Sequence, residues 1–317
     1  MNDLLVEELA LDQIAPGSIQ RFWLKIVSDS FTQPISIPIL IAKGATEGPC
    51  LGLTAALHGN ELNGIPVIQQ LFKEIDPQQL RGSIIGVPVV NIGSFFRKKR
   101  RFSDNVDLNH IMPGKAKGNS SQVYAYNFFE KVIRKINYLV DLHTASFGRI
   151  NSYYVRADMD NKTTKEMAMM QNPEIILHNP PMDGTLRGAA ESIGVPSITL
   201  ELGDPNIFQK SIIDQSLKGV YNVLISLDML DGSISKTTHN TVHCRSSRWM
   251  YTRAGGLLKV IPEVSQMVKK GDLIAQQENI FGDIIENYYA PADGVVIGKS
   301  VSPVNSSGGR ILHLGLV

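Results

Sequence analysis

Short apolar runs alternate with segments of helical spacing from about residue 20 to residue 230. Runs that are apolar at nearly every position predict buried strands, and the segments between them predict helices. This alternation indicates an α/β fold in which helices cover both faces of a sheet. We expect strands at 22–27, 35–42, 50–57, 83–90, 138–142, 152–155 and 197–200, and helices at 64–75, 121–136, 163–170, 186–193 and 211–230.

The pattern changes after Asp231-Gly232-Ser233. Residues 240–317 contain short β-type runs that are interrupted by Gly, Pro and Asp, which predicts a small all-β, barrel-like domain. The polar stretch 232–240 predicts the boundary between the two parts. We therefore expect a catalytic domain at 1–235 and a β domain at 236–317.

The composition narrows the classes of protein. The 317 residues are 43% hydrophobic and 19% charged, as in ordinary globular proteins, and the net charge of +1 predicts no attraction to nucleic acid or membranes. Neither a signal peptide nor an apolar run of about 18 residues is visible, so we expect a cytoplasmic protein. Two cysteines cannot form a disulfide framework, and Cys50, at the start of an apolar run, is expected to be a buried free thiol.

Polar residues of a particular kind end three apolar runs. His58 and Glu61 follow the run at 50–57, His143 ends the next buried run, and Glu201 ends the last. If these strands are neighbours, all four side chains meet at one edge of the sheet. Two histidines and a glutamate form a catalytic zinc set, and a further glutamate supplies the general base. We place Asp141 outside this set, because we expect it on the opposite side of the strand. The pattern alone leaves structural histidines equally open.

Four motifs resemble those of a known protein family. They are His58-Gly59-Asn60-Glu61, Asp107-Leu108-Asn109, Asp141-Leu142-His143-Thr144 and Thr199-Leu200-Glu201-Leu202-Gly203. In this order they resemble the succinylglutamate desuccinylase/aspartoacylase family over nearly the whole chain, most closely the branch found alongside ATP-grasp ligases that add glutamate to proteins. The resemblance implies a mixed sheet with a zinc carboxypeptidase-like fold.

The resemblance also implies roles for particular residues. One Zn²⁺ per chain is expected on His58, Glu61 and His143, with Glu201 as general base. Arg100 is expected to polarise the scissile carbonyl or hold the substrate, and Asn109 to hold a substrate carboxylate. The family usually has arginine where this chain has His110. A histidine side chain is shorter than an arginine, and its unperturbed pKa is near ~6.5. The position of the substrate carboxylate is therefore an open question.

Other basic residues are candidates for the same task. Arg187 and Arg156 are expected to contact an anionic substrate group, with a structural salt bridge as the alternative for each. The basic run 97–101 is either a solvated loop or a basic loop near the mouth of the site.

The last part of the chain resembles the two halves of a biotinyl/lipoyl-type β-barrel. Carriers of that kind display a modified lysine between the halves, but no lysine lies between Lys270 and Lys299. We therefore expect a cap or an assembly surface rather than a carrier. His239, His243 and Cys244 lie close together in the sequence, and we interpret them as structural or exposed residues rather than as a second metal site.

These observations predict a zinc-dependent hydrolase that cleaves the linear amide of a small anionic N-acyl amino acid. Three alternatives stay open: a carboxypeptidase-like or isopeptidase activity on short acidic glutamyl peptides, an esterase, and a catalytically silent metal-binding protein. The sequence also leaves a homo-oligomer open.

Overall fold

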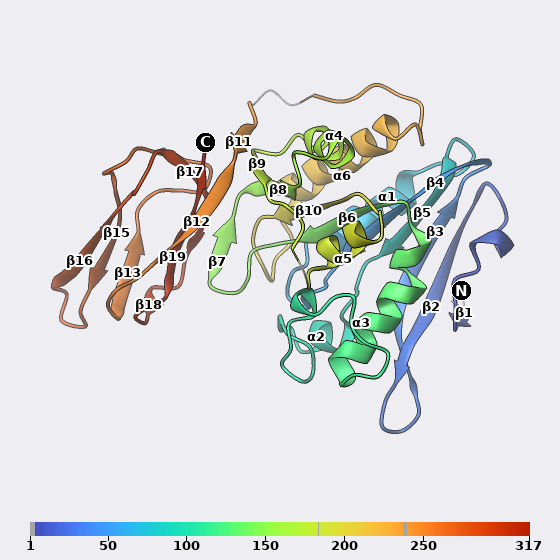
Figure 1. Ribbon diagram of the computed structural model, residues 1–317, viewed down its shortest axis with the longest axis horizontal. Coiled ribbons are helices and arrows are strands. Elements are labelled where there is room, and N and C mark those ends of the chain that lie inside the picture. The colour runs from blue at the N-terminus through green and yellow to red at the C-terminus, as the bar shows by residue number, and fades with distance from the viewer. Residues whose placement is uncertain (1–3, 183, 237–239) are drawn as a thin grey trace.

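A mixed sheet forms the centre of the protein in the computed structural model, which describes residues 4–182, 184–236 and 240–317 (Figure 1). Within these ranges the sheet has ten strands, and β4, β6 and β10 are adjacent and parallel. The predicted fold class is confirmed. In spatial order the strands are β1 (Leu4–Val6), β2 (Ser18–Ser28), β3 (Pro34–Lys43), β5 (Arg81–Val87), β4 (Thr46–Ala55), β6 (Tyr138–His143), β10 (Ser197–Leu202), β8 (Tyr153–Ala157), β9 (Ile175–His178) and β11 (Val242–Cys244).

Helices cover both faces of this sheet and divide its core into two clusters. One cluster packs α1 (Gly64–Glu74), α4 (Lys162–Met170) and α6 (Lys210–Ser226) on one face, and the other packs α3 (Ser120–Lys131) and α5 (Leu186–Ser192) on the opposite face. The apolar side chains of α1 recur every three to four residues, which gives that helix a single buried stripe. The remaining short helices are α2 (Ile92–Phe96), η1 (Leu11–Gln13), η2 (Leu108–His110) and η3 (Ile133–Lys135).

Element ends differ from the sequence predictions at a few places. The strand expected at 50–57 ends at Ala55, because Ala56 adopts a positive φ of 49° and turns the chain into a loop. The helix expected at 121–136 is α3 followed by η3. The short strands β1, β9 and β11 were not predicted, since three or four residues carry little periodicity.

The C-terminal part consists of two further sheets among the described residues, and its all-β class is confirmed (Figure 1). β7, from the first part of the chain, pairs with β17, and β11 pairs with β9, so strands cross the predicted boundary in both directions. The boundary at 235/236 stays a prediction. The first sheet holds β12 (Ser246–Tyr251), β19 (Arg310–Leu316), β17 (Gly294–Ser300), β14 (Met267–Val268) and β7 (Arg149–Asn151), and the second holds β16 (Ile284–Tyr289), β15 (Leu273–Glu278), β13 (Gly256–Val260) and β18 (Val304–Asn305).

Two further sequence predictions concern cysteines and membranes. Cys50 and Cys244 are both buried and free, as expected for Cys50. In the parts of the chain that the structure describes, no helix has the length and apolar character needed to span a membrane.

Candidate metal centre and active site

Three parallel neighbours, β4, β6 and β10, bring the predicted residues to one edge of the sheet. His58 and Glu61 lie in the loop between β4 and α1, and His143 is the last residue of β6. Glu201 lies in β10 directly beside His143 in the strand register. Parallel strands end at the same edge, so these four side chains converge as the sequence predicted.

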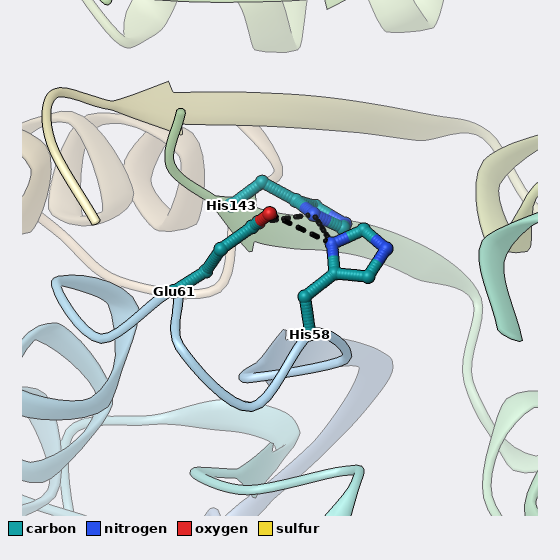
Figure 2. Close-up of side chains that lie close together, drawn as sticks. All are labelled: His58, Glu61 and His143. Carbon is teal, nitrogen blue, oxygen red and sulfur yellow. Dashed lines mark hydrogen bonds and ion pairs between the residues drawn. The ribbon is translucent and has the colours of Figure 1, made fainter. Parts of the chain in front are cut away.

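His58, Glu61 and His143 form a compact buried cluster (Figure 2). Each oxygen of the Glu61 carboxylate lies 2.9 Å from a histidine, Oε1 from His58 Nδ1 and Oε2 from His143 Nδ1. The two Nδ1 atoms are 3.2 Å apart. Two imidazole nitrogens and one carboxylate oxygen are the donor set of a catalytic zinc site, and their convergence fits such an ion.

Two aspartates hold the outer nitrogens of these histidines. Asp107 Oδ1 lies 2.9 Å from His58 Nε2, and Asp141 Oδ2 lies 2.7 Å from His143 Nε2. Carboxylates in this position fix the orientation of metal-binding imidazoles and raise their basicity. Asp141 stays outside the ligand cluster as predicted, but our reason was wrong, because residues two apart in a strand point to the same face.

The pKa values of Glu61 and His143 shift in opposite directions, which favours the charged form of each. Burial works to raise the pKa of Glu61, but the imidazoles of His58 and His143 outweigh it and hold that pKa well below its usual range. Burial works to lower the pKa of His143, but the carboxylates of Asp141 and Glu61 raise it well above its usual value. The Glu61 carboxylate is therefore held in its ionised form, which is the form that binds a metal ion.

The loop that carries His58 and Glu61 is held from three sides. Asn91 donates its Nδ2 to the carbonyl of Leu57 (3.1 Å), and Asn63 donates its Nδ2 to the carbonyl of Leu202 (2.7 Å). At Gly59 a Cβ atom would lie 2.1 Å from the backbone carbon of Ser94, so only glycine fits. The close approach of Ser94 explains the glycine of the motif.

Glu201 is mostly buried beside a cationic side chain. Arg156 Nε lies 3.4 Å from Glu201 Oε1, and Asn151 donates its Nδ2 to Glu201 Oε2 at 3.1 Å. Burial raises the pKa of Glu201, against the opposing charge of Arg156. Arg156 also donates to the hydroxyl of Tyr154 (2.6 Å), so the structure pairs this arginine within the protein.

Arg100 is the member of the basic run 97–101 that lines the site. Its Nη1 donates to Glu61 Oε1 and to Ser146 Oγ (both 2.7 Å), and its Nε donates to Asp107 Oδ2 (2.9 Å). The Nη2 group of Arg100 makes no hydrogen bond to any described residue. The loop that carries the run is thus basic near the site, but through a single arginine.

The other predicted substrate-binding residues also line the cavity. Asn109 accepts the backbone N–H of Leu186 through its Oδ1 (2.7 Å), which leaves its Nδ2 without a partner among described residues. Arg187 is buried and donates to Asn179 Oδ1 (2.9 Å), with Glu191 at 3.4 Å. His110 is exposed at the rim of the cavity. Arg187 is therefore salt-bridged, as its alternative interpretation had it.

A cavity of about 520 Å³ connects these residues, a volume suited to a small-molecule substrate. Part of its wall comes from residues that the sequence analysis missed. They lie on β7, β8, β12 and β19, and only the assembled sheets bring them to the site, so no local motif marks them. They are Arg149, Asn151, Tyr154, Ser247, Trp249, Arg310 and His313.

The suggested second metal cluster is not assembled in the described residues. His243 is exposed and Cys244 is buried as a free thiol, while His239 lies outside the residues that the structure describes.

A buried His–Glu–His cluster, a glutamate on the adjoining strand and an arginine-rich cavity have the composition of a hydrolase active site. Residues 47–227 match the Succinylglutamate desuccinylase/Aspartoacylase catalytic domain, more than half of the chain, and the protein belongs to that family. The family named from the sequence motifs is thereby confirmed, while the narrower likeness to the ATP-grasp-associated branch stays a prediction.

Individual relatives cover almost the whole chain. N-alpha-acetyl-L-2,4-diaminobutyric acid deacetylase of Halomonas elongata is 22% identical over 299 residues, which are 89% of this chain and 86% of that protein. The product-bound Ectoine utilization protein EutE (DoeB) of Ruegeria pomeroyi matches with a TM-score of 0.86 and 23% identity, covering 96% of this chain and 98% of its own. A succinylglutamate desuccinylase from Silicibacter sp. TM1040 matches with a TM-score of 0.85 and 23% identity over 96% and 97%. The two structural matches show that this chain shares the fold of both proteins.

Proposed function

We propose that the protein is a zinc-dependent deacylase that hydrolyses the amide bond of a small anionic N-acyl amino acid. The observation that carries this proposal is the mostly buried Glu201 beside a His–Glu–His cluster that fits zinc, in a cavity lined by arginines. The family and its deacetylase relative support the amide as the bond that is cleaved.

We assign the zinc to His58, Glu61 and His143, and the catalytic roles to Glu201 and Arg100. When bound, the ion would acidify a water molecule and polarise a carbonyl group. Glu201 takes the proton of the attacking water, since burial raises its pKa toward the range of an effective base. The same carboxyl then donates this proton to the leaving amine. The unpaired Nη2 of Arg100 donates to the carbonyl oxygen as negative charge develops there.

The predicted substrate-binding residues differ in whether their polar groups are free to contact a substrate. The free Nδ2 of Asn109 and the exposed ring of His110 are available to a substrate carboxylate. Arg156 and Arg187 also line the cavity, but each pairs with a glutamate of the protein. We assign them mainly to holding Glu201 and the α5 side of the wall, and to a long-range positive field that attracts anions.

The decisive experiment compares Glu201→Gln with the parent protein after both are loaded with zinc. Amine release is measured from a panel of N-acyl amino acids, short glutamyl peptides and the matching esters. We expect Glu201→Gln to lose at least about 100-fold in kcat and to keep one bound zinc per chain, because the residue moves a proton and binds no metal.

A surface variant, Glu130→Gln, is the matched control and should keep full activity, since Glu130 on α3 pairs with Arg134 of η3 and does not line the cavity. Undiminished turnover by Glu201→Gln would refute the assigned base. Release from peptides alone would favour the isopeptidase alternative, and zinc binding without turnover on any substrate would favour the silent metal-binding protein.

A further inference from the structure

Two arginines of the cavity lack an acidic partner among the residues that the structure describes. Arg100, Arg156 and Arg187 each lie within salt-bridge distance of a glutamate. Arg149 and Arg310, which line the same cavity, form no ion pair with any described residue. Repulsion between like charges disfavours two unpaired guanidinium groups near one another, so an anion placed between them would be strongly attracted.

Both of these arginines pack on one aromatic ring. The guanidinium carbon of Arg149 lies 5.1 Å from the centroid of the Trp249 ring, and that of Arg310 lies 4.5 Å from it. Cation–π contact at these distances fixes the two cations without neutralising their charge. Arg149 stands on β7 and Arg310 on β19, so the first part of the chain and the C-terminal sheet each supply one cation.

His313 completes this part of the wall and carries an unpartnered atom. Its ring stacks on Trp249 with centroids 4.5 Å apart, and its Nε2 lies 2.7 Å from Ser247 Oγ. The side chain is only 2% exposed, and its Nδ1 is buried without a hydrogen-bond partner among the described residues. Buried polar atoms are almost always paired in folded proteins, so His313 brings an unsatisfied ring nitrogen to this side of the cavity.

The charges around this wall are consistent with an anionic ligand. Burial and the repulsion of Arg310 and Arg100 lower the pKa of Arg149 to about 10, which still leaves it positive at neutral pH. Arg149 lines the same cavity as Glu61 and Glu201, whose negative charges act on it with the opposite sign. A ligand that spans the cavity can therefore approach both.

We propose that Arg149 and Arg310, held on Trp249 and His313, bind a second carboxylate of the substrate, remote from the scissile amide. This inference rests on the proposed function and narrows its substrate class to amides with an additional carboxylate on the acyl or the amine part. It also gives the C-terminal β sheets a role in selecting the substrate.

Ligand binding at this wall can be measured without turnover, because Trp249 is one of only two tryptophans. In a Trp23→Phe background, fluorescence titrations would use two matched pairs of probes. N-acetyl-L-glutamate against N-acetyl-L-glutamine tests the amine part, and N-succinyl-L-alanine against N-butyryl-L-alanine tests the acyl part. We expect one pair to show saturable binding that is about 10- to 100-fold tighter for the member with the extra carboxylate, as charge-assisted hydrogen bonds are lost in the other.

Arg310→Ala and Arg149→Gln should abolish most of that preference while the neutral probe binds as before. Arg310 is exposed, so its replacement leaves the core intact. Arg248→Ala is the matched control, because Arg248 is an exposed neighbour of Trp249 on β12 that does not line the cavity. Equal affinity for both members of both pairs, or an unchanged preference in Arg310→Ala, would overturn the subsite.

These experiments distinguish a failure of the subsite proposal from a failure of the deacylase proposal. A carboxylate preference that depends on Arg310, without turnover of any amide, supports the subsite and refutes the deacylase. Glu201-dependent turnover that is indifferent to the extra carboxylate and to Arg310 supports the deacylase and refutes the subsite.

Discussion

Replacement of Asp141 by asparagine tests whether the carboxylates behind the histidines tune the metal centre. Asp141 is 1% exposed, accepts the Nε2 proton of His143 at 2.7 Å and accepts the hydroxyl of Thr54 at 2.7 Å. Asparagine has nearly the same shape, so Asp141→Asn keeps the packing and can keep both contacts. It removes the negative charge that makes the His143 imidazole a stronger donor.

The expected change in zinc affinity follows from the hydrogen bond between Asp141 and His143 alone. A hydrogen bond to a charged group contributes about 1.5–3 kcal/mol, and its weakening to a neutral bond leaves about half of that. At about 1.4 kcal/mol for each factor of ten, the loss of about 0.75–1.5 kcal/mol should raise the zinc dissociation constant about 3- to 12-fold. Thr54→Val removes only the second partner of Asp141 and should change zinc affinity by much less.

Competition with a chromophoric chelator at neutral pH measures both dissociation constants directly. Circular dichroism and the unfolding midpoint of the metal-free variants report whether the fold is retained. If Asp141→Asn binds zinc as tightly as the parent protein, the orientation of His143 does not depend on this charge and the reasoning fails.

Two further predictions concern stability. Gly59→Ala should lower the free energy of unfolding, measured by urea denaturation, by about 1–3 kcal/mol, because the added Cβ overpacks against Ser94. Gly93→Ala is the control, because a Cβ at Gly93 meets nothing within 4 Å. Equal effects of the two substitutions would contradict the steric argument. Burial, with the charges of Arg156, Arg149 and Arg310, lowers the pKa of His313 to about 3 from 6.5. The unfolded chain therefore binds a proton that the folded chain rejects, so stability should fall with decreasing pH below about 6.5, by up to about 1.4 kcal/mol per unit. His313→Gln should flatten this pH dependence, and an identical slope in both proteins would show that His313 protonates freely.

The sequence was sufficient to predict that the residues at the ends of neighbouring parallel strands lie close together. His143 and Glu201 each sit near the end of a continuous apolar run, and parallel neighbours must end at the same edge. His58 and Glu61 share one short loop, so their proximity is local. The family resemblance supplied the order of the motifs and the expectation for Arg100.

The opposite wall could not be predicted, because its residues meet only through long-range pairing. Trp249 and His313 face each other across the β12–β19 ladder, and Arg149 joins them because β7 adds to β17. No sequence period marks a three-residue strand that leaves one sheet for another. For Arg156 and Arg187 the residue type was equally uninformative, since only the structure shows which arginines are already paired.

The pairing of β7 with β17 has a consequence for how such proteins diverge. The register joins Asn151 to Gly298 and Arg149 to Ser300, and at Gly298 a Cβ would lie 2.3 Å from the side-chain oxygen of Asn151. A chimera that takes its C-terminal sheets from a relative therefore exchanges a ladder partner and half of a binding wall in the same step. We therefore expect a change of specificity to need paired changes on β7 and β19, and an exchange of the C-terminal sheets alone to disrupt the β7–β17 ladder.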